Sequence, residues 1–187
     1  MGIHTSGKTT IGQRLNSLGL PYYPEIGNEL IQTVDFSSPE IVEWFDREIM
    51  QRELQRDNLF LSEGVEAAVV ETWHVGNIAY AQIRTPSVAN TYKALLKKQI
   101  SKHNPLFLFL DISEATFRQR AGKPVPLGIE EDQFVFYQTI KNNILSISRE
   151  YDIGYYTINA NQDTEKVTQD ICQIMRDHEI SFRKPVA

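Results

Sequence analysis

The chain has 187 residues, 41% of them hydrophobic, and 19 basic against 24 acidic side chains give a formal net charge of −5. This composition is typical of a globular protein and argues against a disordered chain, a collagen-like repeat or a basic surface for nucleic acid. The longest apolar run, at 106–110, is far shorter than the roughly 20 residues of a spanning helix, so we expect neither a membrane segment nor a signal peptide. Cys172, the single cysteine, cannot form an intramolecular disulfide, which suits the reducing cytoplasm.

Strand and helix patterns alternate along the chain. In order, they predict a helix at 7–18, an extended run at 20–24, a long helix that begins behind Ser38 and Pro39, a strand at 67–70, helices at 76–83 and 87–102, a strand at 106–110, a short helix behind Ser113, a helix through 134–147, a strand at 155–158 and a closing helix through 167–174. The uninterrupted apolar run at 106–110 is typical of a strand buried on both faces. This order predicts one domain over 1–187 with a three-layer α/β fold, in which helices flank a mostly parallel sheet and ligands bind at the carboxyl ends of its strands.

Residues 2–10 carry the strongest functional signal. Gly2-Ile3-His4-Thr5-Ser6-Gly7-Lys8-Thr9 fits G-x-x-x-x-G-K-[ST] at every fixed position. In such a phosphate loop the backbone N–H groups point at phosphate oxygens, the lysine reaches the β- and γ-phosphates, and the threonine hydroxyl ligates Mg²⁺. We therefore expect ATP and Mg²⁺ as cofactors, with a glycine-rich turn before a helix as the alternative. The predicted cofactor-binding residues are Gly2, His4, Thr5, Ser6, Gly7, Lys8, Thr9 and Thr10.

Only Met1 stands before this phosphate loop in the sequence. A loop of this kind connects a strand to a helix, and in P-loop folds that strand usually lies in the middle of the sheet. The sequence therefore predicts a gap between two neighbouring strands, with unpaired backbone groups on both sides. Either the first, central strand is truncated, which is our hypothesis, or another segment fills its place.

The phosphate loop resembles that of thymidylate kinase and the related P-loop nucleoside and nucleotide kinases, which reads roughly G-I-D-G-S-G-K-T-T. Further likenesses follow in the same order along the chain: Glu25-Ile26-Gly27-Asn28 to E-P-G-G, Phe45-Asp46-Arg47 to A-D-R, Val69-Val70-Glu71 to a strand with an acidic end, Ala79-Tyr80 to A-Y, and Leu108-Phe109-Leu110-Asp111 to the strand before the lid. The resemblance covers most of the chain, although the phosphate loop alone is individually specific. It implies a P-loop kinase with a lid around 118–130 that carries Arg118 and Arg120.

Two departures from that family bear on the acceptor. His4 stands where thymidylate kinases have an aspartate that contacts the acceptor sugar, and Glu71-Thr72 replaces a D-R pair whose arginine holds the acceptor's phosphate. Thymidylate itself is therefore in doubt. A glutamate at this strand end, with another after the second strand, resembles deoxynucleoside kinases and other small-molecule kinases, whose acceptor brings a hydroxyl and sometimes no phosphate.

Charged residues at strand ends and near the lid are the candidates for catalysis. Glu71 would orient Mg²⁺ through water beside the loop threonine, and Glu25 would bind the acceptor's hydroxyl or accept its proton. Arg118 and Arg120, with the loop lysine, would neutralise the charge on the transferring phosphoryl group. Each has a plain alternative: a solvated strand-end charge for Glu71, a surface loop for Glu25 and an exposed helix face for the arginines.

Arg47, Trp73 and His74 are the further residues predicted to bind the acceptor. Arg47 is favoured by its place in the A-D-R-like segment, and an ion pair on the helix surface is its alternative. Trp73 and His74 follow Glu71 directly and would stack on, or hydrogen-bond, a flat acceptor ring. Packing in the core explains these two side chains equally well.

Together these features predict a cytoplasmic, ATP-dependent kinase that transfers the γ-phosphoryl group to a small acceptor, a nucleoside or a nucleoside monophosphate. Nucleic acid and membranes are not expected as partners, and the sequence does not decide between a monomer and a homodimer. The alternatives are a P-loop regulatory protein whose bound nucleotide switches a partner interaction, and a truncated, inactive kinase.

Overall fold

The strands of the computed structural model, which describes residues 1–121 and 132–180, form two parallel pairs. β1 (Tyr22–Tyr23) pairs with β2 (Val69–Val70), and β3 (Phe107–Asp111) pairs with β4 (Tyr155–Asn159). A parallel bridge between Gly2 and Leu110 adds the start of the chain to the second pair. The two pairs share no ladder within these described ranges, so the single sheet expected from the sequence is divided in two.

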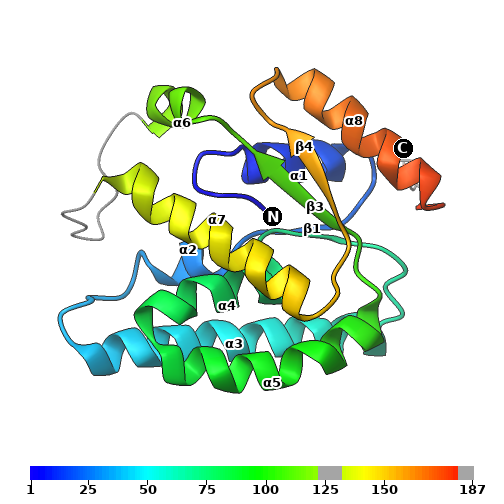
Figure 1. Ribbon diagram of the computed structural model, residues 1–187. Coiled ribbons are helices and arrows are strands. Elements are labelled where there is room, and N and C mark those ends of the chain that lie inside the picture. Colours follow the sequence, from blue (N-terminus) through cyan, green and yellow to red (C-terminus); the bar gives the residue numbers. More distant parts are fainter. Residues whose placement is uncertain (122–131, 181–187) are drawn as a thin grey trace.

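Helices cover both sides of the strands. They are α1 (Lys8–Ser17), α2 (Ile26–Leu30), α3 (Pro39–Ser62), α4 (Trp73–Arg84), α5 (Pro86–His103), α6 (Glu114–Ala121), α7 (Gln133–Glu150) and α8 (Thr164–Asp177). Helices α1 and α8 pack together on one side, while α4 packs against α3, α5 and α7 on the other, as Figure 1 shows. The expected α/β fold with parallel strands between helices is therefore confirmed.

The sequence explains where the main helices begin. Ser38 caps α3 by accepting a hydrogen bond from the Ile41 amide at 3.4 Å, and Pro39 occupies the first turn. Asp132 caps α7 by accepting one from the Phe134 amide at 2.9 Å. Among the helices of residues 1–121 and 132–180, only α2 has no counterpart in the expected elements, because five residues are too few to give a helical period.

The core lies where the apolar patterns predict it. Phe109 of β3 and Ile140, Ile144 and Ile147 of α7 are all buried in one large cluster. Cys172 is buried on α8, as expected of a small apolar side chain. Among the helices of residues 1–121 and 132–180, none has both the length and the apolarity to cross a membrane.

A cavity of about 570 Å³ separates the two strand pairs. Its walls include Val69 and Val70 of β2, Leu108 of β3 and Met1. This is the gap that the sequence predicts beside the start of the phosphate loop. We refer to it below as the slot.

Candidate functional site

The phosphate loop borders a second cavity, of about 680 Å³, which we call the cleft. Residues 4–10 form one wall, and Glu25 and Glu71 project from the ends of β1 and β2. In open parallel sheets, ligands bind outside the carboxyl ends of the strands. The cleft therefore has the position expected of an active site.

Two glycines give the phosphate loop its path. A Cβ on Gly2 would lie 2.5 Å from the Ser6 Oγ and 2.7 Å from the Leu110 carbonyl oxygen, so the chain passes too closely for a larger residue. Gly7 has a φ of 93° at the start of α1, a conformation that favours glycine. The loop thus leads directly into the first turn of α1, whose N–H groups have no acceptor within the helix and attract an anion.

The loop offers unsatisfied donors as well as backbone amides. The hydroxyls of Thr5 and Ser6 are buried and have no hydrogen-bond partner among the described residues. The Lys8 ammonium lies 3.3 Å from the Ile3 carbonyl oxygen and 4.0 Å from the Glu25 carboxylate. Because a buried hydroxyl without a partner is costly, these donors fit the oxygens of a bound phosphate group.

Thr9 and Glu71, expected to serve the metal ion, lie in direct contact. The Thr9 hydroxyl donates to the two carboxylate oxygens of Glu71 at 2.9 and 3.2 Å. The Tyr22 hydroxyl also donates to Glu71, and burial together with this bond raises the pKa of Tyr22, so that it remains a donor. Gly12 of α1 lets Tyr22 approach, because a Cβ there would lie 2.1 Å from the tyrosine ring. A carboxylate beside a hydroxyl is an oxygen donor set that fits Mg²⁺.

Glu25, His4 and Arg120 also border the cleft. Glu25 accepts a hydrogen bond from the Thr72 hydroxyl at 3.0 Å. Burial and the nearby Lys8 lower the pKa of His4, whose ring stacks on Tyr137 at a centroid distance of 5.3 Å. The Arg120 guanidinium reaches the Thr5 carbonyl oxygen at 3.5 Å.

Sequence reasoning missed a second wall of the cleft, formed by Phe45, Asn77, Tyr80 and Arg84. The Arg84 guanidinium lies over the rings of Phe45 and Tyr80, at 5.3 and 5.2 Å from their centroids, and pairs with Asp46 at 2.5 Å. The amide nitrogen of Asn77 is buried and has no partner within the described ranges. The A-D-R-like segment contains the signal, but the resemblance favours Arg47 and not Phe45, the residue of this segment that lines the cleft.

Trp73 and His74 do not line the cleft, and the acceptor wall expected from them is not formed. Positive φ values at Thr72 and Trp73 reverse the chain at the end of β2, so that both aromatic side chains turn back into the core. The Trp73 indole donates to Asp57 at 3.0 Å. His74 is fully buried, and its ring nitrogens contact Asp57 at 2.8 Å and the Tyr92 hydroxyl at 2.6 Å.

Arg47 and Arg118 also lie away from the cleft. Arg47 is exposed on α3 and pairs with Glu43 at 2.6 Å, which is the surface ion pair named as its alternative. Arg118 is exposed on α6 and pairs with Glu114 and Asp132. Of the two arginines expected in the lid, Arg120 alone borders the cleft. The rest of that expected lid, 122–130, lies outside the described residues.

No protein-family model and no curated protein sequence matches the chain. Several solved structures match it along nearly their whole length. Deoxyadenosine kinase from M. mycoides, with the products dCMP and dCDP, has a TM-score of 0.67 at 13% identity, covering 95% of this chain and 97% of that one. The same enzyme with dCTP gives 0.59 at 15% identity and the same coverage. The YorR protein from Bacillus subtilis, in complex with phosphorylated GDP, gives 0.60 at 11% identity over 98% and 97%. The chain therefore has the fold of the deoxyadenosine kinase.

Proposed function

We propose that the protein is an ATP-dependent nucleoside or nucleotide kinase, which transfers the γ-phosphoryl group of ATP to a hydroxyl of a nucleoside or to the phosphate of a nucleoside monophosphate. The observation that carries this proposal is the meeting of Lys8 and Thr9 with Glu25 and Glu71 in one cleft, at the ends of two parallel strands. Phosphoryl transfer requires a triphosphate cradle, a metal site and a base near the acceptor. These four side chains would provide all three.

The phosphate loop and its neighbours would hold the donor. Backbone N–H groups and the hydroxyls of Thr5 and Ser6 would bind phosphate oxygens, and Lys8 would contact the β- and γ-phosphates. Thr9 and Glu71 would hold Mg²⁺, directly or through water. Bound ATP with Mg²⁺ supplies the phosphoryl group and neutralises part of its charge. Arg120, at the edge of the loop, would add positive charge where it develops.

The opposite wall would hold the acceptor. Glu25 would accept the proton of the attacking hydroxyl. The rings of Phe45 and Tyr80 and the Arg84–Asp46 pair would border a flat base, which aromatic and guanidinium planes bind by stacking. Thr72 stands where a thymidylate kinase has its phosphate-binding arginine, so we expect a nucleoside to be preferred over thymidylate. The likeness to a deoxyadenosine kinase supports deoxynucleosides as the first compounds to test.

The test is a coupled ADP-release assay with deoxyadenosine, deoxycytidine, thymidine and thymidylate as acceptors. We expect Lys8→Ala to lower turnover at least about 100-fold, because a cation on the transferring phosphoryl group is removed. Lys97→Ala, on an exposed face of α5, is the matched control and should retain full turnover. Full activity of Lys8→Ala would contradict the proposal.

The same assay separates the two alternative functions. Tight nucleotide binding without acceptor-stimulated ADP release would indicate a P-loop regulatory protein. Failure to bind ATP at all would indicate an inactive kinase. Titration of Mg²⁺-ATP, followed by intrinsic tryptophan fluorescence, gives the binding constant that this comparison needs.

A further inference from the structure

The turn between β2 and α4 has a strained backbone. Thr72 has a φ of 69° and a ψ of −47°, and the Trp73 amide donates across it to the Glu71 carbonyl oxygen at 2.9 Å. This is a γ-turn of the rare kind with a positive φ, which is costly for a β-branched residue such as threonine. Trp73 follows with a φ of 43°. Such conformations persist only where the surrounding structure holds them, and they are concentrated at functional sites.

This turn determines where two carboxylates of the cleft lie. Glu71 directly precedes it and accepts a hydrogen bond from Thr9 at 2.9 Å, while the Thr72 hydroxyl donates to the Oε2 of Glu25 at 3.0 Å. The methyl group of Thr72 lies against Gly76, where a Cβ would approach it to 2.5 Å. A change of backbone direction at Thr72 would therefore release Glu25 and turn Glu71 away from Thr9.

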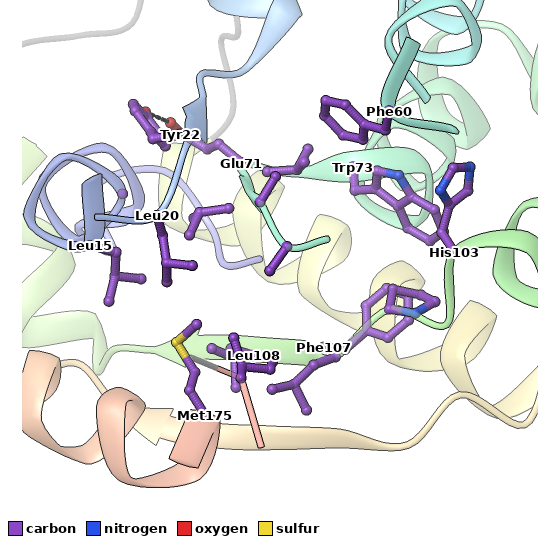
Figure 2. Close-up of a pocket in the computed structure, with 18 of the residues that line it drawn as sticks. Leu15, Leu20, Tyr22, Phe60, Glu71, Trp73, His103, Phe107, Leu108 and Met175 are labelled. Atoms are coloured by element: carbon purple, nitrogen blue, oxygen red, sulfur yellow. Dashed lines mark hydrogen bonds between the residues drawn. The ribbon is translucent and has the colours of Figure 1, made fainter. Parts of the chain in front are cut away.

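Asp57 of α3 holds the side of the turn that faces away from the cleft. Its Oδ2 accepts a hydrogen bond from the Trp73 indole at 3.0 Å and contacts the Nε2 of His74 at 2.8 Å, so two consecutive side chains converge on one oxygen. Asp57 and Trp73 line the slot. In Figure 2, the Glu71 side chain points toward Tyr22, whereas the Trp73 ring points away from it.

Asp57 is a buried anion that is also fixed from its other side. Its residue is 1% exposed, and its Oδ1 accepts a hydrogen bond from Arg56 at 2.9 Å. Burial alone would raise the pKa of Asp57, but the hydrogen bond and charge of His74, and then those of Arg56, lower it overall. An ionised carboxylate makes stronger hydrogen bonds than a neutral acceptor. Helix α3 thus supplies a fixed point for the turn.

We propose that Asp57 is a positioning residue for phosphoryl transfer. By holding the two aromatic side chains that follow the turn, it keeps the backbone reversed at Thr72. The reversed backbone in turn keeps Glu71 beside the loop threonine and Glu25 in its hydrogen bond. This inference rests on the proposed function and deepens it, because Asp57 does not belong to the described residues that border the cleft.

The test compares Asp57→Ala with Asp57→Asn, whose amide oxygen can still accept from Trp73 and His74. We expect Asp57→Ala to lower kcat with a deoxynucleoside about tenfold or more, because both carboxylates are misplaced. The Mg²⁺ concentration for half-maximal rate should rise at least about threefold, since Glu71 would hold the metal less well. The dissociation constant for ATP without Mg²⁺ should change less than about twofold, because the phosphate loop is intact. Asp57→Asn should recover most of kcat.

A second measurement does not depend on activity. Amide exchange at residue 73 reports the hydrogen bond across the turn, and without nucleotide Asp57→Ala should speed it at least about tenfold. Trp73→Phe removes the indole donor and keeps an aromatic ring, so it should speed this exchange as well. It provides the same readout if Asp57→Ala does not fold.

Ile171→Ala is the matched control. Ile171 is buried in α8, which packs on the other side of the strands from α4. Its truncation should lower the melting temperature and leave kcat, the Mg²⁺ dependence and the exchange at residue 73 unchanged.

Three results would overturn the proposal. The first is unchanged exchange at residue 73 in both Asp57→Ala and Trp73→Phe. The second is a loss of kcat in Asp57→Asn as large as in Asp57→Ala, and the third is an equal loss in Ile171→Ala. A wild-type protein without acceptor-dependent ADP release would overturn the proposed function, and with it the role in transfer. Unchanged exchange beside normal wild-type activity would overturn this inference alone.

Discussion

Glu25 combines two contacts on one of its oxygens. Its Oε2 accepts the hydrogen bond from Thr72 and faces the Lys8 ammonium. No hydrogen bond to the Oε1 is made by the described residues, so that oxygen is available to a ligand in the cleft. A carboxylate held on one side and free on the other is well placed to receive a proton from an acceptor hydroxyl.

We therefore expect Glu25→Gln to lower kcat about 100-fold or more, because the amide keeps the shape of the side chain and loses its basicity. The dissociation constant for Mg²⁺-ATP should change less than about threefold, since the phosphate loop is intact. Steady-state kinetics with a deoxynucleoside and an ATP titration give the two numbers. Glu29→Gln, on the exposed face of α2, is the control. An unchanged kcat in Glu25→Gln would exclude its role as base.

Helix α3 buries three carboxylates along one face. Asp46, Glu53 and Asp57 recur at intervals of seven and four residues, which places them on one side of the helix. The apolar spacing of Ile41, Phe45 and Ile49 predicts this helix correctly. It does not predict which charged side chains are buried, because two of the three have partners that are distant in sequence: Asp46 pairs with Arg84 of α4, and Asp57 contacts His74 and Trp73.

Arg56 and Arg47 provide a comparison of buried and exposed ion pairs on this helix. Arg56 contacts Glu53, which has no exposed surface, whereas Arg47 pairs with Glu43 in solvent. We expect Arg56→Met to lower the free energy of unfolding by about 3–5 kcal/mol, because it leaves a buried carboxylate without its cation. Arg47→Met should change it by less than about 0.5 kcal/mol. Urea denaturation measures both, and equal effects would mean that Glu53 does not need Arg56.

At the scale of the whole molecule, the alternation of strands and helices predicts the layers, and the phosphate-loop pattern predicts one wall of the cleft. The other wall could not be inferred, because it depends on how α3 and α4 pack. Proximity to Glu71 in the sequence predicts that Trp73 and His74 border the cleft. The reversal of the chain at Thr72 instead turns both side chains into the core, and no residue pattern in the sequence predicts this reversal.

The stability of the whole molecule is expected to depend on pH through the Met1 amino group. Burial and then the charge of Lys8 lower the pKa of the Met1 amino group from 8.0 to about 5 in the folded protein. Burial also lowers the pKa of His4 and His103. Between about pH 5 and pH 8 the unfolded chain therefore binds a proton at Met1 that the folded chain does not. The contribution of Met1 to the free energy of unfolding should thus rise with pH through this window, by up to a few kcal/mol.

Urea denaturation of the chain across about pH 5 to pH 9 tests this expectation. A chain acetylated at the Met1 amino group is the control, because it lacks the titrating group and should show a smaller rise. If the two chains gain stability equally as the pH rises, Met1 does not contribute to the slope.

The close approach of Gly12 and Tyr22 ties the middle of α1 to the residues proposed to bind metal. Tyr22 has room for its ring only because Gly12 has no side chain, and the same ring carries the hydroxyl that holds Glu71. Substitutions at 12 and 22 are therefore not independent. A larger residue at position 12 would be tolerated only with a smaller one at position 22. That exchange would remove the hydroxyl that donates to Glu71. The role proposed for Glu71 therefore limits which residues can stand at positions 12 and 22.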